Sequence, residues 1–380
     1  MKLSLSQWKA VLLLPLLYFS ACQQDTQKQL EPPVPLPSSA CAIVWQDSTA
    51  QAFVIQLEAV TQSRKNVWPN YQLGDGAVVL DAGMTADSTQ HCLGLWQYGK
   101  PIDYTSTALG PKLSTQLYGY HLDFQNLKEG LENSLLTASQ QPEPIANWLK
   151  EHGVESAVLM PVDFPNFPFE LPTLIKTQIA IHESFHVEVM IRHWFTEAGN
   201  WPNWDEQPDR STLRKCYGEN EEEKAAFRDE QLELAKMIEA LLDEKLEEAL
   251  TIGQSYLNMR DERYKRISHI EILRQDSTTC LCAEAETIME LEEGLADYAS
   301  WTMLYELGTA DRAALTRRYQ AIQNDPFYLT GAMLMHAISL MNEGEVTPIM
   351  EKIINSQDPS SGGLITLFRQ ELASYGKTPH

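Results

Sequence analysis

The part of the chain that follows residue 40 contains short runs rich in β-branched and aromatic residues, separated by turn formers such as Pro69-Asn70 and Gly74-Asp75-Gly76. Such runs predict the strands of a small sheet. The predicted strands cover residues 42–45, 52–60, 77–81, 93–98 and 156–162. Helical patterns over residues 122–139 and 144–152 lie between the last two strands. We therefore expect a small unit that contains both strands and helices.

From residue 171 onward the pattern predicts helices almost throughout. Apolar positions recur with helical spacing over residues 171–195, and one continuous pattern over residues 220–263 is longer than an average globular helix. Further helices are predicted over residues 284–307, 310–323, 328–342, 347–355 and 364–374. The expected fold class is α+β, with a small β-rich N-terminal part followed by a largely helical domain.

Residues 1–21 have the layout of a secretory signal. Lys2 and Lys9 give a basic start, and the apolar run over residues 10–19 is too short to span a bilayer. The segment ending in Ser20-Ala21-Cys22 resembles a bacterial lipobox, which implies that Cys22 is acylated and becomes the new N-terminus. Gln23 after the cysteine favours an outer-membrane lipoprotein. An ordinary signal peptide cleaved near this point is the alternative.

The residues that follow predict how the chain is divided. Residues 22–40 are polar and then proline-rich, which is typical of a tether. An N-terminal α/β portion is expected over residues 41–165, and a helical domain over 166–380 with an insertion at about 198–283. The lipobox resemblance implies a protein of the bacterial cell envelope, lipid-anchored to the membrane through Cys22.

Charge and cysteine content limit the partners and the compartment. Removing residues 1–21 takes away two lysines and no acids, so the formal net charge moves from −23 to −25. Such an acidic chain argues against nucleic acid or anionic lipid headgroups as partners. In an oxidising compartment we expect disulfides between Cys41 and Cys92, and between Cys216 and either Cys280 or Cys282. The sequence leaves that second choice open.

The candidate chemistry centres on residues 182–186, His-Glu-Ser-Phe-His, which read H-E-x-x-H inside the predicted helix over residues 171–195. Residues four apart on a helix share a face and lie about 6 Å apart along the axis. His182 and His186 can therefore bind one tetrahedral metal ion while Glu183 points at its open coordination position. This pattern predicts a zinc site with Glu183 as the general base.

A catalytic zinc needs a third protein ligand. Residues 293–296, Glu-Gly-Leu-Ala, resemble the E-G-[FL]-A segment of gluzincin metallopeptidases, the clan of thermolysin and the aminopeptidase N-type enzymes. The resemblance implies that Glu293 is the third zinc ligand. It also implies that Asp297, one turn further on, accepts a hydrogen bond from a zinc-binding histidine. Glu290 and Glu292 remain alternative ligands.

Residues 328–331 carry Y-x-x-G, similar to a segment of aminopeptidase N-type and glycyl aminopeptidases. This resemblance implies that Tyr328 stabilises the oxyanion of the transition state. His336 is the alternative oxyanion donor. Two features separate the chain from these families. It lacks their amine-binding G-x-M-E-N segment, and His186 lies 107 positions (293 − 186) before Glu293. No specific family is therefore assigned.

These elements together predict a zinc metallopeptidase of the cell envelope that acts on a peptide or protein substrate. The substrate is expected to add as a strand to an edge near residues 157–160. One alternative is a non-catalytic zinc-binding or envelope-assembly lipoprotein, although a purely binding site has no need of Glu183. The other is an interaction protein that docks a partner on its long acidic helix.

Overall fold

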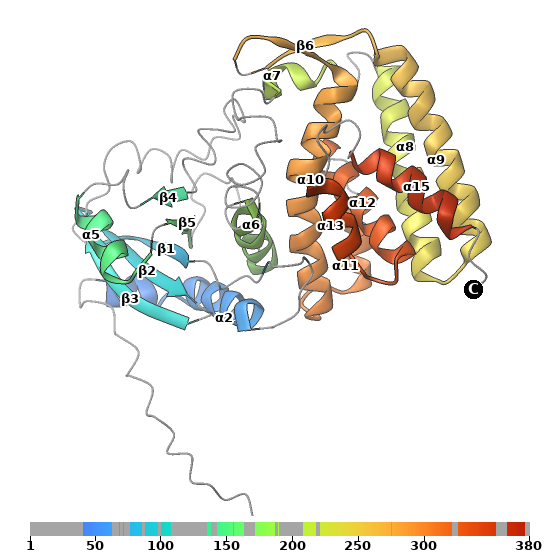
Figure 1. Ribbon diagram of the computed structural model, residues 1–380. Coiled ribbons are helices and arrows are strands. Elements are labelled where there is room, and N and C mark those ends of the chain that lie inside the picture. The colour runs from blue at the N-terminus through green and yellow to red at the C-terminus, as the bar shows by residue number, and fades with distance from the viewer. Residues whose placement is uncertain are drawn as a thin grey trace, which may run out of the picture. The chain divides into compact units, whose positions relative to one another are not determined.

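The structure is a computed structural model of the 380-residue chain (Figure 1). It describes residues 41–62, 68, 71, 77–85, 88–97, 100–107, 135–137, 143–154, 156–162, 172–186, 189, 208–217, 221–274, 276–320, 326–354 and 363–376. The predicted signal peptide over residues 1–21 and the tether over residues 22–40, including Cys22, lie outside the described residues. Among the described helices, none is both long and apolar enough to cross a bilayer.

The first two predicted strands are helices. Residues 42–45 lie in α1 (Ala42–Trp45) and residues 52–60 lie in α2 (Ser48–Gln62). Within residues 52–60 the buried apolar side chains are Phe53, Leu57 and Val60, which follow one another at intervals of four and three residues. That spacing places all three on one face of a helix, whereas a strand would divide them between its two faces. The prediction relied on β-branched content and overlooked this spacing.

A five-stranded sheet follows, with strand order β3-β2-β1-β5-β4. Its strands are β1 (Ala77–Met84), β2 (His91–Gln97), β3 (Lys100–Thr107), β4 (Leu135–Thr137) and β5 (Ser156–Pro161). β1 pairs with β5 in parallel, and the other three pairs are antiparallel. Strand β5 therefore lies between β1 and β4, and β4 pairs with residues 156–158, so the predicted substrate-binding edge is wrong at Ala157 and Val158. The sequence missed β3, and it predicted helix where residues 135–137 form β4.

Helices cover both faces of this sheet (Figure 1). Side chains of β1 alternate between two apolar clusters, as the two-residue period of a strand requires. Val79 packs with Trp148 of α5 (Glu143–Glu151) on one face. On the other face, Leu80 is part of the main core, which also contains Phe53 of α2 and side chains of α6 (Thr173–Phe185). The sheet thereby supports α6, the helix that carries the H-E-x-x-H segment.

The rest of the described chain is helical apart from one short hairpin. Helix α10 is the central element, because twenty of its 25 residues are buried. The elements are α7 (Arg210–Leu213), α8 (Glu221–Leu242), α9 (Leu246–Ile267), β6 (Glu271–Leu273), β7 (Thr279–Leu281), α10 (Cys282–Glu306), α11 (Arg312–Gln320), α12 (Pro326–Met341), α13 (Thr347–Ile354) and α15 (Leu364–Tyr375). The predicted α+β fold class is confirmed.

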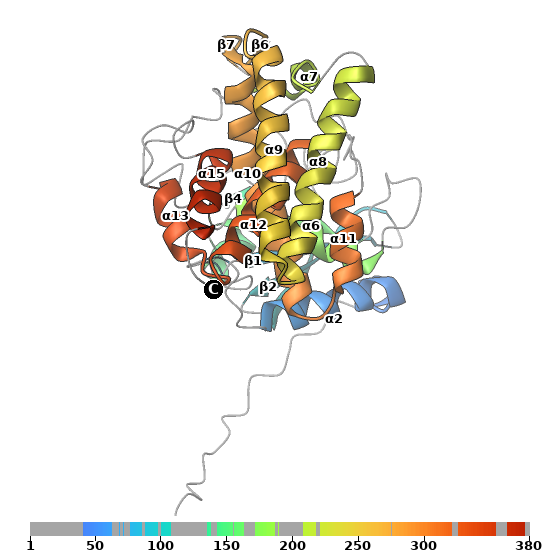
Figure 2. The same ribbon diagram turned by 90° about the vertical axis from the view of Figure 1, so that its right-hand side faces the viewer.

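The continuous helix predicted over residues 220–263 is two helices. α8 and α9 lie side by side (Figure 2), and the chain reverses direction between Leu242 and Leu246. Glu244 has a φ of 59°, in the left-handed region that ends a right-handed helix. The Lys245 N–H donates to the Ala240 carbonyl at 2.9 Å, which closes the last turn of α8. None of these residues is a glycine or proline, so the sequence contained no conventional stop signal.

Two disulfides are present. Cys41 is bonded to Cys92, which confirms that prediction and ties the start of α1 to β2. Cys216 is bonded to Cys282, the first residue of α10, which settles the choice that the sequence left open. Cys280 is a free, buried thiol.

Candidate metal centre

The two histidines of the H-E-x-x-H segment lie on the face of α6 that turns toward α10. An adjacent face is fixed by aromatic contacts, since the ring of Phe185 packs edge-on against Trp68 at 5.5 Å and Tyr71 at 5.3 Å. The Tyr71 hydroxyl also donates to the Ile181 carbonyl at 3.1 Å. These contacts set the rotation of α6 about its axis. His186 keeps helical backbone angles (φ −57°, ψ −46°), so it remains one turn from His182 on the same face.

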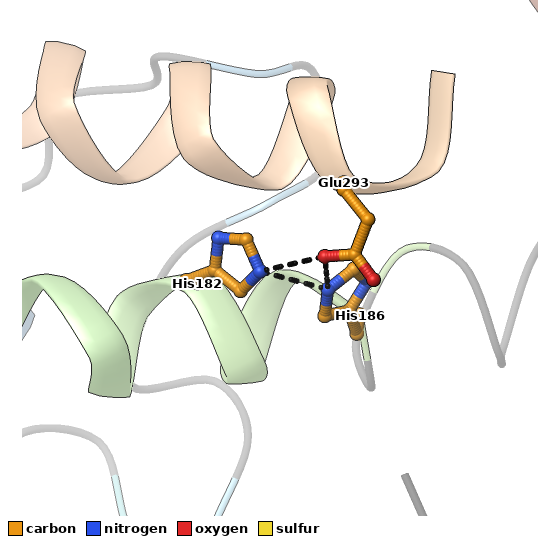
Figure 3. A group of neighbouring side chains, drawn as sticks. All are labelled: His182, His186 and Glu293. Atoms are coloured by element: carbon orange, nitrogen blue, oxygen red, sulfur yellow. Dashed lines mark hydrogen bonds and ion pairs between the residues drawn. The ribbon is translucent and has the colours of Figure 1, made fainter. Parts of the chain in front are cut away.

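Glu293 of α10 meets both histidines (Figure 3). Its Oε2 lies 3.1 Å from Nε2 of His182 and 3.3 Å from Nε2 of His186, and the two ring nitrogens are 3.0 Å apart. Around a tetrahedral metal with bonds near 2.0–2.1 Å, ligand atoms lie about 3.3–3.4 Å apart. The three atoms are therefore spaced almost as one metal ion would require, and a small expansion would admit it.

All three side chains are buried, so their charges interact more strongly than they would in water. Burial alone lowers the pKa of His182. The hydrogen bond and charge of Glu293, with the charges of Glu183 and Asp297, more than offset this, so the pKa of His182 lies above its usual value. The site is thus an electronegative environment that favours a cation. Glu183 is half-buried, and its charge is one of those that raise the pKa of His182.

The other glutamates of α10 do not join this group. Glu290 lies one turn before Glu293, but its Oε2 accepts a hydrogen bond from Arg260 at 2.8 Å. Glu292 is buried and lies outside the cluster of ligand atoms that the described residues form. Glu293 is the glutamate that the structure brings to the histidines.

Asp297 lies one turn beyond Glu293, as predicted, but it binds other partners. Its Oδ2 accepts a hydrogen bond from Arg318 at 2.7 Å, and its Oδ1 accepts one from Gln178 at 3.1 Å. Nδ1 of His182 is buried without a hydrogen-bond partner in the structure, so the predicted Asp297–histidine bond is not formed there. The bond to the Arg318 guanidinium joins two charged groups and is therefore the stronger of the two.

The sequence did not identify Gln178 or Arg318 as neighbours of this site. Gln178 precedes His182 by four residues, so the helical spacing that found His186 also places Gln178 on the same face. Arg318 belongs to α11, whose position beside α10 no local pattern reveals. Its Nη1 is buried without a partner in the structure.

Tyr328, at the start of α12, lies against the centre. Its ring stacks on that of His182, with the centroids 5.7 Å apart and the planes inclined by 14°. The side chain is half-buried. The structure thus places Tyr328, the predicted oxyanion donor, beside one of the two predicted histidine ligands.

His336, the alternative oxyanion donor, has other neighbours. Its Nδ1 lies 2.8 Å from the Tyr319 hydroxyl, and its ring contacts those of Tyr298 and Tyr319 in the main core. Burial lowers the pKa of His336 to about 4, so the ring is neutral at pH 7. These contacts are those of a core histidine.

Comparison with known proteins adds no relatives. No protein-family model, curated protein or solved structure matches this chain. The gluzincin resemblance therefore stays a prediction based on short motifs, and any function must be argued from the centre itself.

Proposed function

We propose that the chain is a zinc-dependent hydrolase of peptide bonds. The observation that carries this proposal is the convergence of His182, His186 and Glu293, whose ligand atoms all lie within 4.8 Å of one another. They come from two helices separated by a long stretch of sequence. A buried group of two imidazoles and one carboxylate at the interface of those helices has a clear chemical use as a metal site.

The donor set indicates which metals fit. Two imidazoles and one carboxylate form the ligand set of catalytic zinc sites that keep one position open. Calcium and magnesium prefer shells made entirely of oxygen atoms, so the two histidines disfavour them. Other divalent transition metals accept the same donors, and metal analysis of the purified protein is needed to identify the native ion.

The residues around the centre suit amide hydrolysis. Zinc, when bound, polarises a carbonyl group and lowers the pKa of a coordinated water molecule. Glu183 would accept the proton of the attacking water and pass it to the leaving amine. The Tyr328 hydroxyl would donate a hydrogen bond to the substrate oxygen on which negative charge develops. His182 and His186 must be neutral at their Nε2 atoms to serve as ligands.

The proposed location rests on the N-terminal sequence alone. We propose that the protein is exported, acylated at Cys22 and anchored to a membrane of the cell envelope. Mass spectrometry of the N-terminal peptide tests this directly. A diacylglyceryl group on Cys22 is the expected result, and an unmodified N-terminus near this point would indicate an ordinary cleaved signal peptide.

The central experiment combines metal analysis with hydrolysis of a peptide library. The unsubstituted protein should bind about one zinc per chain. Glu183→Gln should retain that zinc while its rate falls at least 10²-fold, which is about the smallest contribution expected from a general base. Glu151→Gln, an exposed acid at the end of α5, is the matched control and should change neither quantity.

The outcomes separate the readings. Full activity in Glu183→Gln would exclude the proposed mechanism. Stoichiometric zinc in a protein that cleaves no library member would favour the non-catalytic zinc-binding lipoprotein. Loss of metal in His182→Ala without loss of hydrolysis would show that the activity belongs elsewhere.

A further inference from the structure

Helices α10 and α12 touch backbone to backbone beside the centre, at Gly294 and Gly331. A Cβ atom placed on Gly294 would lie 2.7 Å from the carbonyl carbon of Gly331, and closer still to its Cα. A Cβ atom on Gly331 would lie 2.8 Å from the Cα of Gly294 and 2.9 Å from the Cα of Glu290. All of these neighbours are main-chain atoms, which cannot rotate out of the way. The two glycines are therefore what permits this approach.

Each glycine is close in sequence to a residue of the centre. Gly294 directly follows Glu293, and Gly331 lies three residues, almost one turn, after Tyr328. The contact point is thus shared by the helix that provides the carboxylate ligand and the helix that provides the stacked phenol. Its geometry determines how far Tyr328 can reach across toward His182.

The distance by which an added methyl group would push α10 and α12 apart can be estimated from these contacts. Ordinary van der Waals contact begins at 3.4 Å, so a methyl group on Gly294 would push the helices apart by at least 0.7 Å (3.4 − 2.7). The ring centroids of Tyr328 and His182 are 5.7 Å apart, so a separation of 0.7 Å could lengthen this distance to about 6.4 Å (5.7 + 0.7), toward the upper end of the range of about 4.5–7 Å for ring pairs, and so weaken the stack. Misplacement of a catalytic group by about 1 Å can cost 10²-fold in rate.

We propose that the Gly294–Gly331 contact is a positioning element that holds Tyr328 over His182. The catalytic consequence of this placement rests on the proposed function. The placement itself does not, because the stack exists between two side chains of the chain whether or not a substrate is cleaved. This inference also gives the glycines of the E-G-x-A and Y-x-x-G segments a physical reason.

The competing explanation is that the glycines serve only the general packing of the helices. Gly253 of α9 supplies the matched control. A Cβ atom there would lie 2.8 Å from Sδ of Met237 and 2.9 Å from Cδ1 of Leu372. It is also crowded, with neighbours nearer than 3.0 Å, but these neighbours are side chains, and helices α8, α9 and α15 carry none of the centre's residues.

The test follows the histidine ring signals of protein labelled at histidine carbons. Tyr328→Leu identifies the His182 signal, because removing the stacked ring removes its ring-current shift. Gly331→Ala and Gly294→Ala should each move that signal toward its Tyr328→Leu position and weaken zinc binding by about tenfold, the lower end of the effect of residues that support metal ligands. Gly253→Ala should leave the signal and the zinc affinity unchanged.

A double-mutant cycle gives the second readout. If Gly331→Ala has already displaced the tyrosine, adding Tyr328→Leu should cause little further loss of zinc affinity. Additive losses would overturn the proposal, and so would an unshifted His182 signal in a folded Gly331→Ala protein. Because zinc affinity and the ring signal do not require turnover, a protein without peptidase activity would refute the proposed function and leave this test intact.

If neither alanine variant folds, the unsubstituted protein supplies the test. The cross-peak between the Hα protons of Gly294 and Gly331 and the ring-current shift of His182 are followed together on warming below the melting temperature. The two should weaken in parallel. A His182 shift that persists after the glycine cross-peak has gone would overturn the proposal.

Discussion

Glu290 and Glu293 lie three residues apart on α10, both buried, yet they bind opposite kinds of partner. Glu290 accepts a hydrogen bond from the Arg260 guanidinium at 2.8 Å, whereas Glu293 faces the two histidines at 3.1 and 3.3 Å. Each residue advances about 100° around a helix, so three residues leave the two side chains about 60° apart. That rotation places Glu290 in an ion cluster with Arg260, Arg263 and Glu286, and it places Glu293 in the candidate metal centre.

The division of roles predicts which glutamate controls metal binding. Glu293→Gln should lower zinc affinity by at least about 100-fold, more than the effect expected for a residue that only supports a ligand. Glu290→Gln should leave zinc affinity within about threefold, because its carboxylate lies outside the cluster of ligand atoms. Competition with a chromophoric chelator measures both. The reverse order of effects would show that Glu290 is the ligand.

The same ion cluster predicts unequal effects on stability. Burial, together with the charge of Glu286, outweighs the attraction of Arg260 and raises the pKa of Glu290 to about 8. The raised pKa favours the neutral form of Glu290, and Glu290→Gln is nearly isosteric with that form. Burial also raises the pKa of Glu286, but Arg260 and Arg263 more than offset it and hold it below its usual value. Glu286→Gln should cost about 3–5 kcal/mol, as expected when a buried pair is broken.

Urea unfolding at several pH values measures the cost of Glu286→Gln and tests the raised pKa of Glu290. A folded-state pKa above the unfolded value contributes stability that is present at low pH and is lost as the pH rises through about 8. Raising the pH from 5 to 9 should therefore destabilise the unsubstituted protein more than Glu290→Gln. Equal pH slopes for the two proteins would argue against a protonated Glu290.

Local spacing and short motifs were sufficient to predict the features of this molecule that involve only a few neighbouring residues. His182 and His186 follow from helical periodicity, and Glu293 follows from one short segment. The partner of Asp297 could not be predicted, because Arg318 arrives from a separate helix whose packing depends on the whole core. The break between α8 and α9 was missed because Glu244 adopts a left-handed conformation, which glutamate rarely does.

Burial of His336 predicts a loss of stability in acid. Its pKa is lowered to about 4 by burial, below the usual value of 6.5, so its contribution to stability is complete above pH 6.5 and is lost as the pH falls toward 4. His336→Gln retains an acceptor for the Tyr319 hydroxyl but cannot be protonated. The variant should lose less stability than the unsubstituted protein between pH 7 and 4.5. Thermal melts at both pH values measure the difference, and parallel losses would contradict the prediction.

Because Cys216 is bonded to Cys282 and Cys280 is free, substitutions of Cys280 and Cys282 should differ in their effect on stability. The bond joins residues 66 positions apart, so its loss should cost about 4 kcal/mol on the chain-entropy model. Cys280→Ser removes a free thiol and should cost less than about 1 kcal/mol, the usual range of a mild substitution. Cys282→Ser should be less harmful than the loss of a disulfide, because Cys280 lies in the same buried cluster as Cys216 and can replace the missing partner.

The double variant Cys280→Ser/Cys282→Ser removes that replacement and should show the full loss. Peptide mapping without reduction identifies which bond each variant forms, and urea unfolding measures its stability. Equal stability of Cys282→Ser and the double variant, with no Cys216–Cys280 peptide in the map, would show that the thiol cannot substitute. Since Cys282 begins α10, the same measurements also report how strongly this disulfide holds the helix that carries Glu293.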